Sequence, residues 1–231
     1  MARVIVLDTE TTGLDPTSDQ IVELAAIGVD LKHEVFETLV DPCRDIPPEA
    51  MAVHHITEKM CRGKPVGVDA VGEMLAFMDF PEVIVAHNAK FDRAFIEALA
   101  PPNYKPKWIC TYKSAQVIWP NAPRHTNQVL RYWLGLNPNL PDGLAPHRAL
   151  YDILVTREIF QSLLTFKTIN ELHQISSNPV LLTTCSFGKH KGKPWSQVDR
   201  GYLQWIVRQP EEEMNEDVRF TAQHYLRGSR G

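Results

Sequence analysis

The sequence has little cysteine, no long apolar run and no excess of basic residues, and each of these absences excludes a class of protein. Its four cysteines are spread over 231 residues with no CxxC pair, which argues against a zinc cage and against a disulfide framework. No apolar stretch approaches the ~20 residues that a membrane helix needs. The net charge of −4 excludes a basic nucleic-acid coat protein, although an enzyme that acts on nucleic acids stays open.

The composition is that of an ordinary globular protein, with 44% apolar residues. The length suits one domain of roughly 150–200 residues with an appendage. The N-terminus carries no signal-peptide pattern, so we expect reduced thiols, a cytoplasmic location and no association with a membrane.

Hydrophobic patterning predicts an α/β fold. Apolar runs rich in β-branched residues predict strands at 4–7, 20–29, 35–40, 83–85 and 108–111. Helical periodicity predicts helices at 71–78, 90–99, 126–134 and 147–164. The first strand is expected to end at Asp8, and residues 28–32 to form a turn. A meander followed by alternating helices and strands predicts a mixed sheet with helices packed on it.

The composition shifts after Phe166, where a short helix at 169–175 leads to a linker at 176–179. We therefore predict one domain over residues 1–175 and a separate C-terminal region over 180–231. Lys189, Lys191 and Lys193 stand on a glycine-punctuated turn in that region. They are candidates for phosphate contacts with nucleic acid, and the alternative is a solvated hairpin turn.

Acidic residues lie at the end of the first predicted strand and at the start of a predicted helix. Asp8 and Glu10 project from one face of the first strand, because residues i and i+2 share a face. The alternative is a solvated pair at a strand edge. Asp92 falls in the first turn of a helix for which Asn88 is the expected N-cap. Its alternative role is to complement the helix dipole.

His147 and Asp152 open the last long helix, with Pro146 expected in its first turn. A spacing of five would put His147 and Asp152 on different faces of the helix, so His147 can reach a site with Asp152 only from a loop or from the first turn. The alternative is that His147 is a structural histidine. Acidic residues on three separate segments are consistent with one oxygen-rich metal site. Such ligands favour Mg²⁺ or Mn²⁺ over zinc.

Three segments resemble the motifs of the DnaQ-like 3′–5′ exonucleases, and the His-x4-Asp spacing of the third resembles the DEDDh subgroup. They read DTETTGL (8–14), HNAKFD (87–92) and HRALYD (147–152). The resemblance implies an RNase H-like fold and two Mg²⁺ ions, replaceable by Mn²⁺. Their ligands would be Asp8, Glu10, Asp92 and Asp152, with His147 taking the proton of the attacking water. The implied products are nucleoside 5′-monophosphates released from a 3′ end.

Other residues acquire substrate roles from the same resemblance. The segment PEAMAVHHIT (48–57) resembles the family's loop between the first two motifs, so Glu49 and His54 would contact the terminal nucleotide. Leu14 would wedge beside the terminal base, or else cap the core from a loop. Thr9 and Thr11 would contact the last nucleotide.

The segments SFGKHKGK (186–193) and GYLQW (201–205) resemble the C-terminal region of one DNA-degrading branch of the family. We therefore expect a DNA exonuclease that degrades single-stranded or duplex DNA from its 3′ ends and acts in repair. The alternatives are an exoribonuclease that trims RNA and a non-catalytic nucleic-acid-binding module. We expect neither a polymerase nor a sliding clamp as partner, although QSLLTF (161–166) faintly resembles a clamp-binding peptide. Apolar residues on the last helices form core contacts or a homodimer face.

Overall fold

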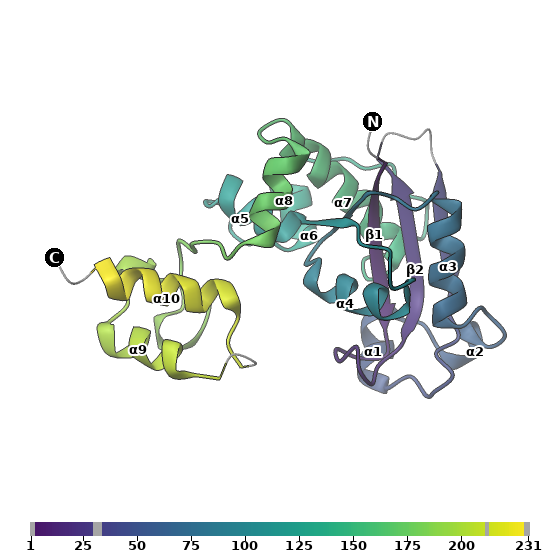
Figure 1. Ribbon diagram of the computed structural model, residues 1–231, viewed down its shortest axis with the longest axis horizontal. Coiled ribbons are helices and arrows are strands. Elements are labelled where there is room, and N and C mark those ends of the chain that lie inside the picture. Colours follow the sequence, from purple (N-terminus) through teal and green to yellow (C-terminus); the bar gives the residue numbers. More distant parts are fainter. Residues whose placement is uncertain (1–2, 30–33, 211–212, 229–231) are drawn as a thin grey trace.

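The computed structural model describes residues 3–29, 34–210 and 213–228, so most of the turn expected at 28–32 lies outside the described residues. A five-stranded mixed sheet is the centre of the molecule (Figure 1). Its strands are β1 (Val4–Thr11), β2 (Ile21–Gly28), β3 (Val35–Leu39), β4 (Val83–Ala86) and β5 (Lys107–Cys110). They lie in the order β3-β2-β1-β4-β5, with β1 antiparallel to β2 and parallel to β4. The predicted mixed α/β sheet is confirmed.

Alternating side chains of β1 build two hydrophobic cores, one on each face of the sheet. Val4 and Val6 join the core under α7 (Ala149–Leu164), which also packs on β2. Ile5 and Leu7 join the core under α3 (Gly67–Phe77) and α4 (Lys90–Leu99). Three shorter helices complete the α7 side: α5 (Thr111–Ile118), α6 (Asn127–Trp133) and α8 (Ile169–Ser177).

The first strand is longer than the sequence indicates. We expected it to end at Asp8, but β1 continues to Thr11 because β2 pairs with it along that whole length. Asp8 lies opposite Ala25, and Glu10 lies opposite Glu23. Backbone pairing with β2 overrides the poor strand propensity of the acidic residues.

Several short helices were not anticipated. The segment expected as a loop at 48–57 contains α1 (Pro48–His54), which has proline in its first turn, and α2 (Glu58–Cys61) follows it. The strand expected at 108–111 stops at Cys110, and Thr111 begins α5. The helix α8 runs through Ser177, so the first half of the expected linker is helical.

Residues 180–210 and 213–228 form what we call the C-terminal lobe, which stands beside the sheet (Figure 1). It contains two short 3-10 helices, η1 (Gly188–His190) and η2 (Trp195–Gln197), and the helices α9 (Arg200–Arg208) and α10 (Glu216–Gly228). Its hydrophobic cluster is separate from those of the sheet. The buried members are Cys185, Trp195, Val198, Leu203, Ile206, Val218 and Ala222. The division at residues 175 and 180 stays a proposal, which this separate cluster supports.

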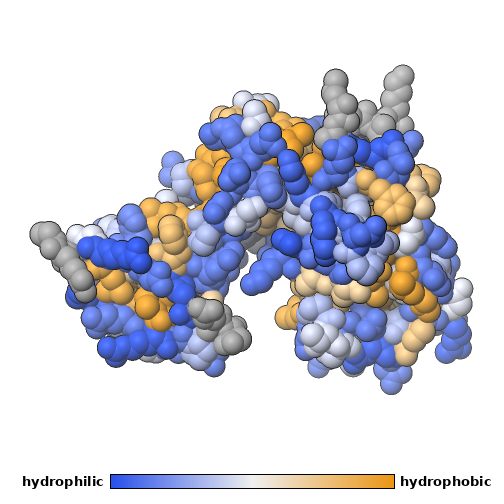
Figure 2. Space-filling view, in the orientation of Figure 1, coloured by the Kyte–Doolittle hydropathy of each residue, from blue (hydrophilic) through white to orange (hydrophobic). Residues whose placement is uncertain are grey.

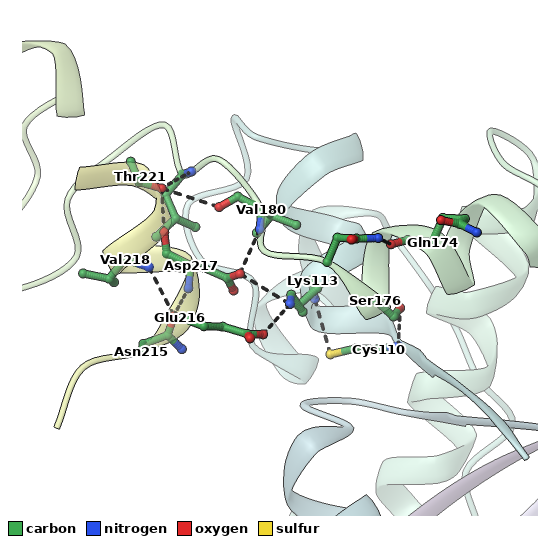
Figure 3. A network of polar contacts seen from close by, with 12 residues as sticks. Cys110, Lys113, Gln174, Ser176, Val180, Asn215, Glu216, Asp217, Val218 and Thr221 are labelled. Carbon is green, nitrogen blue, oxygen red and sulfur yellow. Dashed lines mark hydrogen bonds and ion pairs between the residues drawn. The ribbon is translucent and has the colours of Figure 1, made fainter. Parts of the chain in front are cut away.

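An ion-pair network attaches the C-terminal lobe to the rest of the molecule (Figure 3). Lys113 of α5 lies 2.7 Å from Glu216 and 3.4 Å from Asp217, both in the first turn of α10. The Val180 amide donates to Asp217 Oδ1 over 2.8 Å. Because Lys113 and Asp217 are nearly buried, this contact is shielded from solvent and fixes the lobe against α5.

None of the described helices combines the length and the apolar character needed to cross a bilayer. All four cysteines are free thiols, and Cys43 is the exposed one.

Candidate active site

Asp8 and Glu10 project from the same face of the central strand, as the i, i+2 spacing predicts. The alternative of a solvated pair at a strand edge does not hold, because both side chains are partly buried and burial raises the pKa of each carboxyl. The carboxylates therefore stand at a fixed position near the end of β1.

Asp92 is held beside them by Thr9. The Thr9 amide donates to Asp92 Oδ1 over 3.0 Å, and the Thr9 hydroxyl donates to the same oxygen over 2.8 Å. Both residues are buried. The expectation that Asn88 caps this helix is wrong: Asn88 has a left-handed φ of 71°, and Ala89 occupies the cap position with no side-chain hydrogen bond. The turn at Asn88 directs the chain from β4 into α4.

His147 lies in the loop before α7 and is exposed, while Asp152 belongs to the first turn of that helix. Pro146 also precedes the helix, which begins at Ala149, so the placement of Pro146 in the first turn is wrong. The His147 amide donates to Asp152 Oδ2 over 3.0 Å, with φ of 63° at His147. Ligand atoms of Glu10, His147 and Asp152 all lie within 4.8 Å of one another.

The carboxylates of this site repel one another. Burial, followed by the negative charges of Asp92, Asp152 and Glu10, raises the pKa of Asp8 well above its ordinary value. Burial and the Asp152 charge raise the pKa of Glu10 to about 8. Burial raises the pKa of Asp92 to about 7, although the hydrogen bonds from Thr9 oppose this. Burial also raises the pKa of Asp152.

These residues fit a divalent cation. Mutual repulsion among clustered carboxylates is relieved by a bound metal ion, which also keeps them ionised at neutral pH. All four acids offer hard oxygen ligands of the kind that Mg²⁺ and Mn²⁺ prefer. Since both Thr9 bonds end on Asp92 Oδ1, the other carboxylate oxygen is left for a ligand role.

Sequence reasoning missed Glu23 of β2, whose side chain is fully buried. Arg148, which follows His147, donates from Nε to both Glu23 oxygens, at 3.0 and 3.1 Å. The Ala149 amide donates to Glu23 Oε2 over 2.8 Å. Glu23 therefore anchors the first turn of α7, which carries Asp152. The available signal was a single acid inside the apolar strand IVELAAIG.

The residues expected to contact substrate differ in accessibility. Leu14 is 85% exposed, so it does not cap the core, and a wedge role stays open. Glu49 is exposed in the first turn of α1. His54 is buried, and its Nδ1 accepts the Ile56 amide over 3.0 Å. Thr11 is buried, and its hydroxyl donates to the Gly13 carbonyl over 2.6 Å.

The three lysines expected to touch nucleic acid lie in and just after η1, in the C-terminal lobe and not among the carboxylates. Lys189 pairs with Asp199 at 3.2 Å, whereas Lys191 and Lys193 are exposed without an acidic partner among the described residues. The segment that resembles a clamp-binding peptide contributes Leu163 to the core, where it is fully buried.

Comparison with known proteins agrees with this geometry. The RNase_T exonuclease family matches residues 5–160. Exodeoxyribonuclease 10 of Escherichia coli is 37% identical over 229 residues, covering 96% of this chain and 97% of that protein. The epsilon subunit of DNA polymerase III from Treponema pallidum is 36% identical over 167 residues, covering 68% of this chain and 74% of that protein.

A solved structure of exonuclease X in complex with 5′-overhanging duplex DNA matches with a TM-score of 0.64 and 35% identity. The match covers 75% of this chain and 99% of that one. The RNase H-like fold is thereby confirmed. The expected resemblance of the C-terminal region is confirmed too, because the match to Exodeoxyribonuclease 10 spans almost the whole chain. The chain therefore belongs to the DnaQ-like 3′–5′ exonuclease family and is a hydrolase of phosphodiester bonds.

Proposed function

We propose that the protein is a Mg²⁺-dependent 3′–5′ exodeoxyribonuclease that releases nucleoside 5′-monophosphates and acts in cytoplasmic DNA repair. One observation carries the proposal: Asp8, Glu10, Asp92 and Asp152 converge from three segments, and the exposed His147 stands beside them.

Two divalent ions, Mg²⁺ or Mn²⁺, would be held by Asp8, Glu10, Asp92 and Asp152. When bound, such ions lower the pKa of a water molecule and neutralise charge at the scissile phosphate. The proximity of Glu10 and Asp152 supports their sharing one ion. Thr9 keeps Asp92 oriented, and Glu23 with Arg148 keeps the start of α7 in place.

His147 acts as the general base in this proposal. Its exposed position in the loop before α7 leaves the imidazole free to accept the proton of the attacking water, at pH values where imidazole is neutral. Leu14, exposed just beyond β1, would pack against the terminal base. Glu49 would contact the terminal nucleotide from α1.

The choice of DNA over RNA rests on the relatives. Exodeoxyribonuclease 10 is named for DNA, and the solved exonuclease X is bound to 5′-overhanging duplex DNA. Both share more than a third of aligned residues with this chain. The free lysines Lys191 and Lys193 support contact with a phosphate backbone.

A digestion of 5′-labelled substrates tests the proposal. Single-stranded DNA, blunt duplex, 3′-recessed duplex and RNA of the same sequence are each incubated with Mg²⁺ and with EDTA. We expect a shortening ladder on DNA that EDTA abolishes and that Asp8→Asn slows by at least about 1,000-fold. A ladder on RNA alone would reassign the substrate, and metal binding without hydrolysis of any substrate would favour a binding module.

A further inference from the structure

An aromatic and basic row lies along one side of α9, in the C-terminal lobe. Tyr202, Trp205 and Arg208 are three residues apart, so they lie on one side of the helix. The rings of Tyr202 and Trp205 stack, with centroids 5.2 Å apart and an interplanar angle of 26°. Trp205 is 46% exposed. The core of the lobe does not account for this tryptophan, because Leu203 and Ile206 supply the buried face of α9.

The loop at η1 holds Tyr202 in position. A Cβ atom at Gly188 would lie 2.1 Å from the Tyr202 hydroxyl oxygen, so only glycine allows this close approach. His190 lies 4.8 Å from Tyr202 between ring centroids. Lys189 Nζ lies 5.3 Å from the Tyr202 ring centroid, in a cation–π contact. Contacts from the η1 loop therefore hold Tyr202 in place, and the stacked pair forms an aromatic platform whose exposed ring is that of Trp205.

The segments that carry this platform are rich in basic residues. Lys189 is paired with Asp199, but Lys191, Lys193, Arg200 and Arg208 are exposed and form no ion pair within the described part of the chain. A polyanion complements these free cations, and a flat aromatic group complements the open face of Trp205. Single-stranded nucleic acid combines both chemistries, because its bases are unpaired and its phosphates regularly spaced.

We propose that Tyr202 and Trp205 form a stacking site for an unpaired base of single-stranded DNA, with Lys191, Lys193 and Arg208 contacting its phosphates. The inference rests on the proposed function only in taking DNA as the polymer. A duplex does not satisfy the site, since the faces of its bases are already stacked.

The lobe stands beside the part of the chain that carries the carboxylates (Figure 1). A cavity of about 320 Å³ lies between α4 and the start of α10, and its lining includes Lys90 and Arg93, close in sequence to Asp92, together with Asn215 and the first residue of α10, Glu216. Figure 2 shows a wider hollow between the lobe and the rest of the molecule, with a mostly hydrophilic rim. The Lys113 ion pairs keep the lobe at this place.

Fluorescence anisotropy of the full-length protein tests the site. The probes are a labelled oligodeoxythymidylate of about twenty nucleotides, a fully paired blunt duplex and an abasic strand with the same phosphates, all in EDTA to prevent hydrolysis. Trp205→Ala is expected to weaken oligodeoxythymidylate binding by about 5- to 100-fold. Trp205→Phe retains an aromatic ring, so its affinity for oligodeoxythymidylate should fall much less. Phe220→Ala is the matched control, because Phe220 of α10 is 40% exposed in the same lobe.

Binding of the abasic strand should be the same for the wild type and for Trp205→Ala, since that strand offers no base to stack. Equal affinity of the wild type and Trp205→Ala for oligodeoxythymidylate would overturn the inference, as would an equal loss on the abasic strand. Failure of the wild type to cleave any DNA would refute the proposed function, whereas the anisotropy result would still decide the stacking site.

Discussion

Glu23 and Arg148 lie 125 residues apart in the sequence and form an ion pair beneath the start of α7. The Glu23 side chain is 1% exposed, and it also accepts the Ala149 amide. Through these bonds β2 sets the position of the segment that holds His147 and Asp152. The pair touches neither substrate nor metal in the proposed mechanism, so its contribution is one of positioning.

Glu23→Gln is therefore expected to reduce both stability and activity. It retains the shape of the side chain but removes the charge opposite Arg148, and we expect the free energy of unfolding to fall by about 1–3 kcal/mol. The single-turnover rate should fall by about 10- to 100-fold with a raised half-saturation for Mg²⁺, because a displaced Asp152 holds the ion less well. Glu97→Gln, which breaks the exposed Arg93 pair, serves as control and should change neither quantity.

Arg148→Met should lower the free energy of unfolding more than Glu23→Gln does. We expect a total loss of about 3–5 kcal/mol, because the substitution leaves a buried carboxylate without its partner. The double variant should recover part of that loss. Strictly additive effects of the two substitutions on unfolding would contradict the proposed coupling.

Thr9→Val tests the bond that orients Asp92. Valine has the shape of threonine but cannot donate from a hydroxyl, so one of the two donors to Asp92 Oδ1 is lost. We expect a loss of about 10- to 100-fold in Mg²⁺ affinity or in rate, as is typical for partners of metal ligands. Calorimetric titration with Mn²⁺ and a rate measurement are the readouts, and Thr9→Ser should restore both. Wild-type values for Thr9→Val would mean that the amide bond alone orients Asp92.

The stability of the metal-free protein should depend on pH in a particular direction. The pKa of Glu10 is raised to about 8 and that of Asp92 to about 7, above the values of roughly 4 in an unfolded chain. The folded state therefore binds more protons than the unfolded state, so these groups lower stability as pH rises through about 4 to 8. Mg²⁺ binds their ionised forms and offsets this loss.

Differential scanning calorimetry can check this expectation. The rise in Tm caused by saturating Mg²⁺ should increase between about pH 6 and about pH 9. Asp8→Asn, which removes one of the mutually repelling charges, should raise the Tm of the metal-free protein at the upper pH and make the response to Mg²⁺ smaller. A Mg²⁺ effect that is constant with pH would refute the electrostatic origin of the shifts.

Lys113→Met is expected to loosen the C-terminal lobe. The substitution leaves the nearly buried Asp217 with its Val180 bond but without a cation, so the contact between α5 and α10 should weaken. Small-angle X-ray scattering should show a larger radius of gyration, while far-UV circular dichroism stays unchanged. Lys167→Met, in an exposed pair on the sheet side of the molecule, is a suitable control and should leave the radius unaltered.

The sequence was sufficient to predict an element where the pattern of that element lay within one segment of the chain. The helix at 90–99 was predicted to the residue, because its amphipathic face is followed by Pro101 and Pro102. The three motifs lie on β1 (Asp8 and Glu10), on α4 (Asp92), and at the loop and first turn of α7 (His147 and Asp152). Local propensity failed at β1, where pairing with β2 keeps polar residues extended. It also failed at α1, which is too short to show a helical period.

Glu23 could not be assigned from the sequence for a different reason. A lone acid in an apolar strand shows that a buried partner is needed, but not which cation of a chain with 24 Lys and Arg provides it. The same holds for the pair of Lys113 and Asp217, which are 104 positions apart. Only the assembled fold brings such charges together.

The Lys113 contact has a kinetic consequence if the lobe binds a strand as proposed. A DNA chain held at the lobe stays close to the catalytic carboxylates after each cleavage, so its new 3′ end returns at a high effective concentration. Complete departure then requires both contacts to open together. The length of an uninterrupted run of cleavages, its processivity, would accordingly be governed by a salt bridge on α5 and not by the chemistry of the catalytic centre.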